Sequence, residues 1–400
     1  MTRKTWPSSL YHRVCCFVLF FMAASASFNG FYEKWHFREY NASLTPSPRT
    51  GPEFPHVEVD RILDGTAAKP YIYRQLIPSA AKWIDRITPS SVKDGLYNFR
   101  PGFGPDTLPF VLFDSPVGRS QAYFFRYLVV YLSTFLFTLL AVYAMYWICM
   151  ALKIHPGAAI IAPVAVILLF PYIQTVGGYF YDFPELAFLA LAVWIALRFN
   201  WWWIIPIAAL GTWNKESFLL AVPTLYPIIR QRASRLSSLL GTGVLGIVCV
   251  AVYYPVRQFF AHNPGGTTEN HLAQQLEYFL HPGRLVYHHS IYEKTYALLL
   301  PPLATVLPLA LLLWTVWRSW QKMPPVIRQH GVIAAVINIP LYLLFCWPGE
   351  LRDFSLLFVF FLLTLACNIS EYLSSPVENV GAPSMLGAEA PTDRSLSVRW

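Results

Sequence analysis

The chain has 400 residues, of which 55% are apolar, 16% are aromatic and only 13% are charged. A soluble protein is about a quarter charged, so this composition, with long apolar runs from end to end, predicts an all-α polytopic membrane protein. The net charge of +8 does not indicate nucleic-acid binding, because most cations flank apolar runs and no GxGxxG, Walker or zinc-finger pattern is present.

Residues 1–373 are expected to form a single transmembrane domain with about ten hydrophobic segments. The first, Leu10–Phe28, follows three cations and is expected to be an uncleaved helix, although "AASAS" near its end leaves a signal peptide as the alternative. The six cysteines all fall inside apolar runs and are interpreted as packing residues rather than disulfides. Further spans are expected at Tyr123–Met150, Gly157–Val176, Pro184–Phe199, Leu236–Phe260, Ala297–Trp317, Val332–Trp347 and Phe354–Tyr372.

Residues 201–229 form another apolar stretch, interrupted at its centre by Asn214, Lys215 and Glu216. The positive-inside rule places the N-terminus and the cations on both sides of this stretch in the cytoplasm, so the stretch must leave and return on one side as a hairpin. Each arm has 13 residues, or about 20 Å of helix against a hydrocarbon core of about 30 Å. The tip is therefore expected at membrane depth, beside a cavity open to the extracytoplasmic side. The alternative is a Lys–Glu pair that merely caps two helices near the interface.

This topology leaves two long extracytoplasmic loops, 29–122 and 261–296, and a cytoplasmic tail, 374–400, whose composition predicts disorder. In the first loop, "IPSAAKWIDRI" predicts a short helix on the membrane surface that begins near Pro78. The second loop has five histidines, but their spacing matches no standard metal pattern, so no metal site is predicted. A divalent cation is the only candidate cofactor.

Four polar clusters fall on the extracytoplasmic side, within "HVEVDRILDGTAAKPYIYRQLIP", "GGYFYDFPELAF", "NKE" and "WPGELRDF". Two of them have a plain structural alternative: Asp182 as a helix N-cap before Pro184, and Glu350–Asp353 as a solvated turn. The residues of these clusters that are candidates for chemistry or its support are Glu58, Asp60, Tyr73, Arg74, Asp182, Asn214, Lys215, Glu216, Glu350, Arg352 and Asp353.

The layout resembles the GT-C superfamily of membrane-embedded glycosyltransferases, which take sugars from polyprenyl-phosphate carriers. Asp60 precedes Gly65 and "KPYIYR", similar to the acid and "G-x-x-P-Y-x-Y" segment of bacterial members. The "YDFP" and "NKES" segments resemble "Y-D-P" and "N-R-E-T" segments of bacterial relatives. The resemblance implies a bacterial inner-membrane protein with cytoplasmic termini, an outward active face and an essential acid in the first outer loop.

The reaction implied by the resemblance transfers a sugar, with inversion, from a polyprenyl phosphate to a glycan or lipid acceptor. The lipid phosphate leaves without a general acid, so one carboxylate suffices as base. Asp60 is the first candidate, Glu53 and Glu58 are its rivals in the first loop, and Asp182 is a further candidate.

Cations must hold the phosphate and its developing charge, and the candidates for this role are Lys215, Arg74 and Arg352. We expect Glu216, or an outer acid such as Asp182, to pair with Lys215 in the empty protein. Asn214, Glu350, Asp353 and Tyr73 are expected to support the site.

Two other functions stay open at this stage. A polysaccharide polymerase or ligase also uses lipid-linked sugars and usually depends on Arg and His in outer loops, where this chain has several histidines. A transporter or flippase commonly has inverted repeats with broken helices in matched halves. The sequence has one broken helix and no matching half, which disfavours a transporter.

Overall fold

The computed structural model describes residues 10–44, 59–99, 120–173, 179–266, 270–281, 306–346 and 351–374, and these are helical with no strand among them. Five helical segments in this part of the chain are long and apolar enough to cross a membrane. The all-α class predicted from composition is therefore confirmed for the described residues, and the five candidate spans fit the predicted membrane protein. The five segments belong to α1 (Leu10–Leu44), α7 (Gln121–Ala151), α12 (Arg235–Phe259), α17 (Pro325–Phe345) and the run of η3 (Leu351–Leu357) with α18 (Phe358–Ser374).

The remaining helices are shorter, so the expected number of about ten spans is not established. They are α2 (Val59–Asp64), α3 (Leu76–Ile87), α4 (Ser90–Asn98), α8 (Pro156–Ile173), α9 (Asp182–Arg198), α10 (Ile204–Asn214), α11 (Ser217–Ile229), α13 (Leu272–Leu280) and α16 (Val306–Ser319). Two 3-10 turns, η1 (Tyr71–Tyr73) and η2 (Trp201–Trp203), join some of them.

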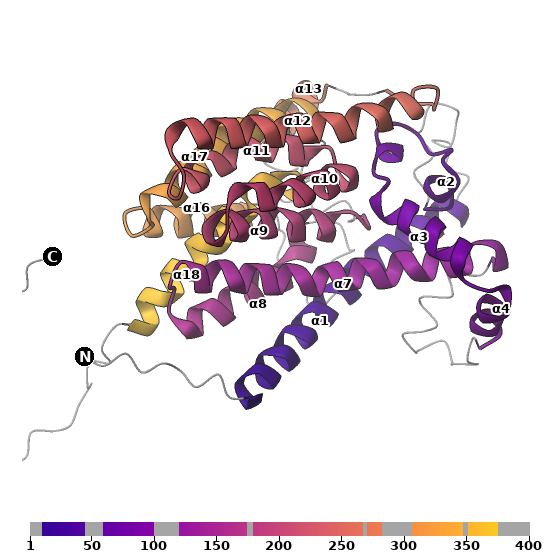
Figure 1. Ribbon diagram of the computed structural model, residues 1–400, viewed down its shortest axis with the longest axis horizontal. Coiled ribbons are helices and arrows are strands. Elements are labelled where there is room, and N and C mark those ends of the chain that lie inside the picture. The colour runs from indigo at the N-terminus through magenta and orange to yellow at the C-terminus, as the bar shows by residue number, and fades with distance from the viewer. Residues whose placement is uncertain are drawn as a thin grey trace, which may run out of the picture.

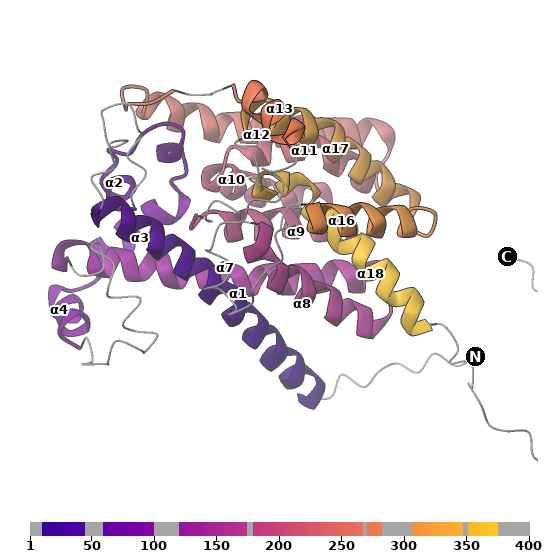
Figure 2. The same ribbon diagram turned by 180° about the vertical axis from the view of Figure 1, so that it is seen from behind.

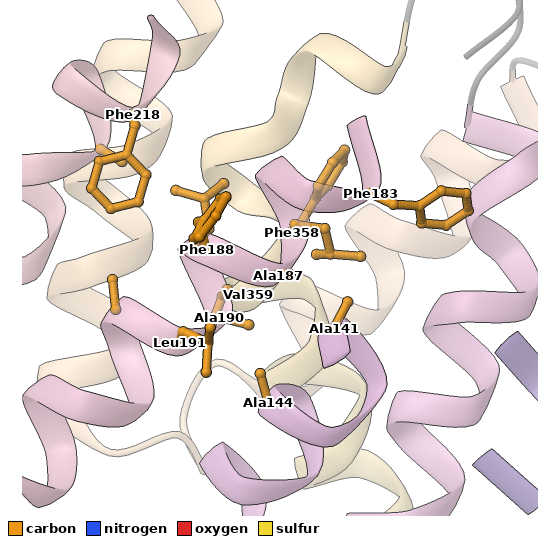
Figure 3. Close-up of a cluster of buried hydrophobic side chains, with 14 of the residues drawn as sticks. Ala141, Ala144, Phe183, Ala187, Phe188, Ala190, Leu191, Phe218, Phe358 and Val359 are labelled. Atoms are coloured by element: carbon orange, nitrogen blue, oxygen red, sulfur yellow. The ribbon is translucent and has the colours of Figure 1, made fainter. Parts of the chain in front are cut away.

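Helix α9 lies in the middle of the bundle, packed against α7, α10, α11 and α18 (Figures 1 and 2). Its sequence is apolar all round, and a helix of this kind is stable only when neighbours cover every face. Small residues such as Ala187 and Ala190 allow close approach. Figure 3 shows them between Ala144 of α7, Phe218 of α11 and Val359 of α18. This central helix sets the position of the charged groups at its start.

The break predicted at the centre of residues 201–229 is confirmed. Helix α10 ends at Asn214, Lys215 has an extended backbone, and α11 begins at Ser217. The two arms pack closely, because a Cβ atom added at Gly211 would lie 2.5 Å from the Phe218 ring of the other arm. Beyond α11, Arg232 Nη1 donates to the carbonyl oxygen of Leu197, 2.9 Å away in the last turn of α9. The stretch therefore returns to the end of the bundle from which it started, as a hairpin.

Helix α7 projects well beyond the start of α9. Thr134 Oγ1 donates to the carbonyl oxygen of Phe180, 3.3 Å away and just before α9. Thr134 is 13 residues after Gln121, the first residue of α7, which corresponds to about 20 Å of helix. Helices α2, α3 and α4 pack around this projecting part and form one end of the molecule (Figure 1). The start of α9 is thus recessed below that end.

Two expectations about the first loop need revision. The loop was expected to begin at residue 29, but α1 continues as a helix to Leu44. The predicted short helix exists as α3, but it packs on α7, with Ala81 buried and Ile87 exposed. In the second loop the structure describes α13. The tail was predicted to be disordered, and its residues after Ser374 lie outside the described part of the chain.

Candidate functional site

Six ionic side chains from four distant segments meet at the start of α9, and we refer to them as the charge cluster. Its three cations are almost wholly buried, with 8% of Arg74 and 6% of each of Lys215 and Arg352 exposed. Burying a charge without a partner is costly, so the pairing within the cluster decides whether this arrangement is stable. The members are Arg74, Asp182, Glu185, Lys215, Glu216 and Arg352.

Local structure brings these segments together. The backbone N–H of Gln75 donates to the carbonyl oxygen of Trp213, 3.1 Å away, which ties the segment after η1 to the hairpin tip. Asn338 of α17 anchors η3 from the other side. Its Nδ2 donates to the carbonyl oxygen of Asp353 at 2.7 Å, and its Oδ1 accepts from the N–H of Leu356 at 3.1 Å. These ties hold the segments of Arg74 and Arg352 against the bundle.

Lys215, at the tip of the hairpin, pairs with two acids of α9. Its Nζ lies 2.7 Å from Oε2 of Glu185 and 3.7 Å from Oδ1 of Asp182. The two acids are three residues apart, which places both carboxylates on one face of the helix. Ser217 Oγ also donates to Glu185, at 2.5 Å. The expectation that Glu216 or an outer acid such as Asp182 pairs with Lys215 is met by Asp182, whereas Glu216 pairs with Arg74.

Asp182 links two cations and is not an N-cap. The N-cap residue of α9 is Tyr181, and it makes no side-chain capping bond. Asp182 Oδ2 instead accepts from the N–H of Tyr179 at 2.8 Å and pairs with Arg352 Nη1 at 3.4 Å. Arg352 is itself buried, so a solvated turn is the wrong interpretation for this residue.

Arg74 forms the third pairing of the cluster. Its Nη2 lies 3.3 Å from Oε1 of Glu216, and its Nη1 donates to the hydroxyl of Tyr181. The guanidinium also lies over the Tyr181 ring, with its Cζ 4.2 Å from the ring centroid. Burial by itself lowers the pKa of Arg74, but Tyr181 and Glu216 outweigh it and raise the pKa above its ordinary value. Arg74 is charged, because a guanidinium keeps its proton at any ordinary pH.

Three tyrosines form an aromatic wall beside the cluster. The rings of Tyr179 and Tyr181 are stacked, with centroids 5.1 Å apart and planes 7° apart. Tyr71 packs on Tyr179 at 5.4 Å, and Arg352 lies over the Tyr179 ring at 4.7 Å. Because ring faces attract cations, this wall helps to hold the guanidinium groups of Arg74 and Arg352.

Asp60, the first candidate for the base, belongs to a different group. It lies half-buried on α2, near Tyr123 of α7. In the same group, Asp64 accepts a hydrogen bond from Tyr123 and pairs with Arg126 at 3.4 Å. Arg126 is eight residues before Thr134 on α7, which is about 12 Å along the helix from the level of the charge cluster.

The other predicted residues are placed as follows. Asn214 Nδ2 donates to the carbonyl oxygen of Tyr181 at 2.9 Å, so Asn214 supports the cluster. Asp353 is half-buried and lies near enough to Lys215 for their charges to interact. Tyr73 is buried beside Tyr253, and burial is the main cause that raises its pKa. Glu58 and Glu350 lie outside the described residues.

Sequence reasoning missed Glu185, Ser217 and the tyrosine wall. The spacing of Asp182 and Glu185 was a usable signal for Glu185, because residues three apart share a helix face. Within the described part of the chain, no group of three or more His, Cys, Asp or Glu side chains is arranged to hold a metal ion. Comparisons with family models, with curated proteins and with solved structures gave no match to this chain.

Proposed function

We propose that this chain is a membrane-embedded glycosyltransferase that takes a sugar from a polyprenyl phosphate and that the charge cluster binds the phosphate. The proposal rests on one observation, the convergence of Arg74, Lys215 and Arg352 from three distant segments. Asp182 is shared by Lys215 and Arg352. Tyr181 is shared by Arg74 and Lys215, since Lys215 Nζ lies 5.7 Å from the centroid of the ring that Arg74 covers.

The depth of the cluster supports a ligand carried by a lipid. Helix α9 has 17 residues, or about 25 Å of helix, against a hydrocarbon core of about 30 Å. A cluster at its start then lies near the boundary between the acyl chains and the headgroups, where a polyprenyl carrier presents its phosphate. In this proposal the protein lies in a bacterial inner membrane, with both termini cytoplasmic and the projecting end of α7 on the extracytoplasmic side.

In the proposed reaction, the charge cluster and the group around Asp60 have different roles. The acceptor hydroxyl attacks the anomeric carbon from the face opposite the phosphate, a new C–O bond forms, and the bond to the phosphate oxygen breaks with inversion. The cations stabilise the charge that develops on the leaving phosphate. A carboxylate takes the hydroxyl proton, and we assign this role to Asp60, with Glu58 as the rival.

Asp182 is less suited to act as the base. Its Oδ2 accepts from the N–H of Tyr179 and pairs with Arg352, and its Oδ1 is buried and faces Lys215 Nζ at 3.7 Å. A base must have an oxygen that can approach the acceptor hydroxyl to within hydrogen-bonding distance. We therefore assign Asp182 to the positioning of the two cations.

The test is a transfer assay with the full chain in membranes. Polyprenyl phosphates that carry one radiolabelled sugar are supplied in parallel with preassembled oligosaccharide-lipids. We expect label to move from the monosaccharide donors to a glycan or lipid product, with release of the polyprenyl phosphate, and Arg352→Lys to slow transfer. Arg86→Gln, which changes an exposed charge on α3, is the control expected to match the wild type.

The other outcomes of this assay contradict the proposal in distinct ways. Transfer from the oligosaccharide-lipids alone would identify a polymerase or ligase. Saturable flux of lipid-linked sugar in proteoliposomes, with no covalent product from either donor, would identify a transporter.

A further inference from the structure

The guanidinium of Arg74 has one edge that is only half used. Its Nε and Nη2 atoms form the edge that can hold both oxygens of an oxyanion at once. Nη2 pairs with Oε1 of Glu216 at 3.3 Å, whereas Nε is buried and has no hydrogen-bond acceptor among the described residues. Oε2 of Glu216 is likewise buried without a donor in this part of the chain. Arg74 Nε and Glu216 Oε2 could therefore form a second hydrogen bond beside the Nη2–Oε1 pair, but they do not form it.

Glu216 is held more weakly than the other acids of the charge cluster. Glu185 accepts hydrogen bonds from Lys215 and Ser217. Asp182 accepts from the N–H of Tyr179 and from Arg352, and it is also ion-paired with Lys215 at 3.7 Å. Both of their side chains are almost wholly buried, whereas 32% of the Glu216 side chain is exposed. Moving a partly exposed carboxylate into water costs little, because it regains hydration as it loses its partner.

Arg74 keeps its place when Glu216 leaves. Its Nη1 bond to the Tyr181 hydroxyl and its contact with the Tyr181 ring do not involve Glu216. Its backbone is held by the bond between Gln75 and Trp213. The half-used edge is thus a preorganised receptor for an oxyanion, since a ligand need not pay to order the guanidinium.

We propose that Glu216 occupies the place of an incoming phosphate oxygen on the Nε–Nη2 edge of Arg74, and that the lipid phosphate binds by displacing it. This inference rests on the proposed function and assigns to Glu216 the role of an internal competitor. The phosphate makes two bonds where Glu216 makes one. After transfer, the return of Glu216 to Nη2 favours release of the polyprenyl phosphate.

The test is equilibrium binding of farnesyl phosphate to the purified full chain in detergent, with farnesol as the uncharged probe. Glu216→Gln removes the competing charge, so it should bind farnesyl phosphate on the order of threefold to tenfold more tightly than the wild type. Arg74→Lys loses the two-bond edge and should bind it at least about tenfold more weakly. Glu277→Gln, an exposed acid on α13, makes the same charge change away from the cluster and should leave affinity unchanged. Farnesol binding should not differ among the four proteins, and each variant should elute and melt as a folded protein.

Two results would overturn the inference and are distinguishable. If Glu216→Gln binds farnesyl phosphate no more tightly than the wild type while Arg74→Lys binds it more weakly, Glu216 is not a competitor, and the proposed phosphate site stands. If the wild type does not distinguish farnesyl phosphate from farnesol, both the inference and the proposed function are wrong.

Discussion

Arg232, three residues after the end of α11, donates a hydrogen bond to the carbonyl oxygen of Leu197, one residue before the end of α9. This contact places the entrance and the exit of the α10–α11 hairpin at one end of the bundle. Helix α4 packs on the projecting part of α7, at the opposite end. The two ends should therefore face opposite sides of the membrane.

Cysteine labelling tests this topology. In a chain whose six native cysteines are replaced, Ser91→Cys on α4 should react with an impermeant maleimide in intact spheroplasts. Gln231→Cys, beside Arg232, should react only after permeabilisation. Both positions are exposed, so a difference between them reports sidedness. Labelling of Gln231→Cys in intact spheroplasts would contradict the topology.

Replacement of Lys215 should destabilise the protein strongly. Lys215→Met leaves the buried carboxylates of Glu185 and Asp182 without their common cation. Breaking a buried ion pair by removing one partner typically costs about 3–5 kcal/mol. The loss should appear as a lower melting temperature in detergent. Lys322→Met breaks the ion pair with Glu371, in which both side chains are exposed, and should change the melting temperature little.

A double variant separates lost charge pairing from lost packing. Lys215→Met with Glu185→Gln should recover part of the melting temperature, because the unpaired carboxylate is removed together with the cation. If the double variant melts at or below the temperature of Lys215→Met, the ion pair with Glu185 is not the cause of the loss.

The sequence was sufficient to predict the hairpin and the three cations of the cluster. Apolar length, flanking charge and the "NKE" break report directly on membrane topology. The pairing of Lys215 with Glu185 and of Arg74 with Glu216 was not predicted from the sequence. Helix α9 is apolar all round, so no hydrophobic stripe indicates how it is rotated or which face its acids present to Lys215.

The extension of α1 was missed for a different reason. Beyond Phe28 the helix continues through "YEKWHFREY", which is polar and charged. Hydropathy locates the part of a helix inside the bilayer but not the part that continues into water, where helix formation depends on propensity and tertiary contacts. The role assigned to Asp60 stays a prediction, because no contact among the described residues joins it to the charge cluster.

Asp60→Asn tests the assigned base. We expect the variant to accumulate and insert normally, because Asp60 is half-buried in the group at the projecting end of α7. Transfer should fall by a factor of about 10² to 10⁴, the usual contribution of a positioned general base. Initial rates with saturating donor check this outcome. Near-normal rates in Asp60→Asn, with a loss in Glu58→Gln, would move the role to Glu58.

Close packing of the hairpin predicts that alanine has different effects on stability at two glycine positions. At Gly211 an added Cβ would lie 2.5 Å from the Phe218 ring, whereas at Gly243 on α12 nothing lies within 4 Å. Gly211→Ala should therefore lower stability by about 1–3 kcal/mol through overpacking. Gly243→Ala should be neutral or stabilise by up to about 1 kcal/mol, because alanine loses less backbone entropy in a helix. Melting temperatures of the two variants check the contrast, and equal shifts would show that the arms are not in contact.

The chain order of the charge cluster has a consequence for biosynthesis. Asp182 and Glu185 are synthesised before Lys215, and the hairpin follows α9 after only a short turn, so the lysine enters the membrane when its partners are already there. Arg352 is made last. Until it arrives, the members already present are two cations and three acids, one negative charge in excess. A nascent chain that stops before η3 therefore retains an uncompensated carboxylate in its interior, and charge balance is reached only when the last segments have docked.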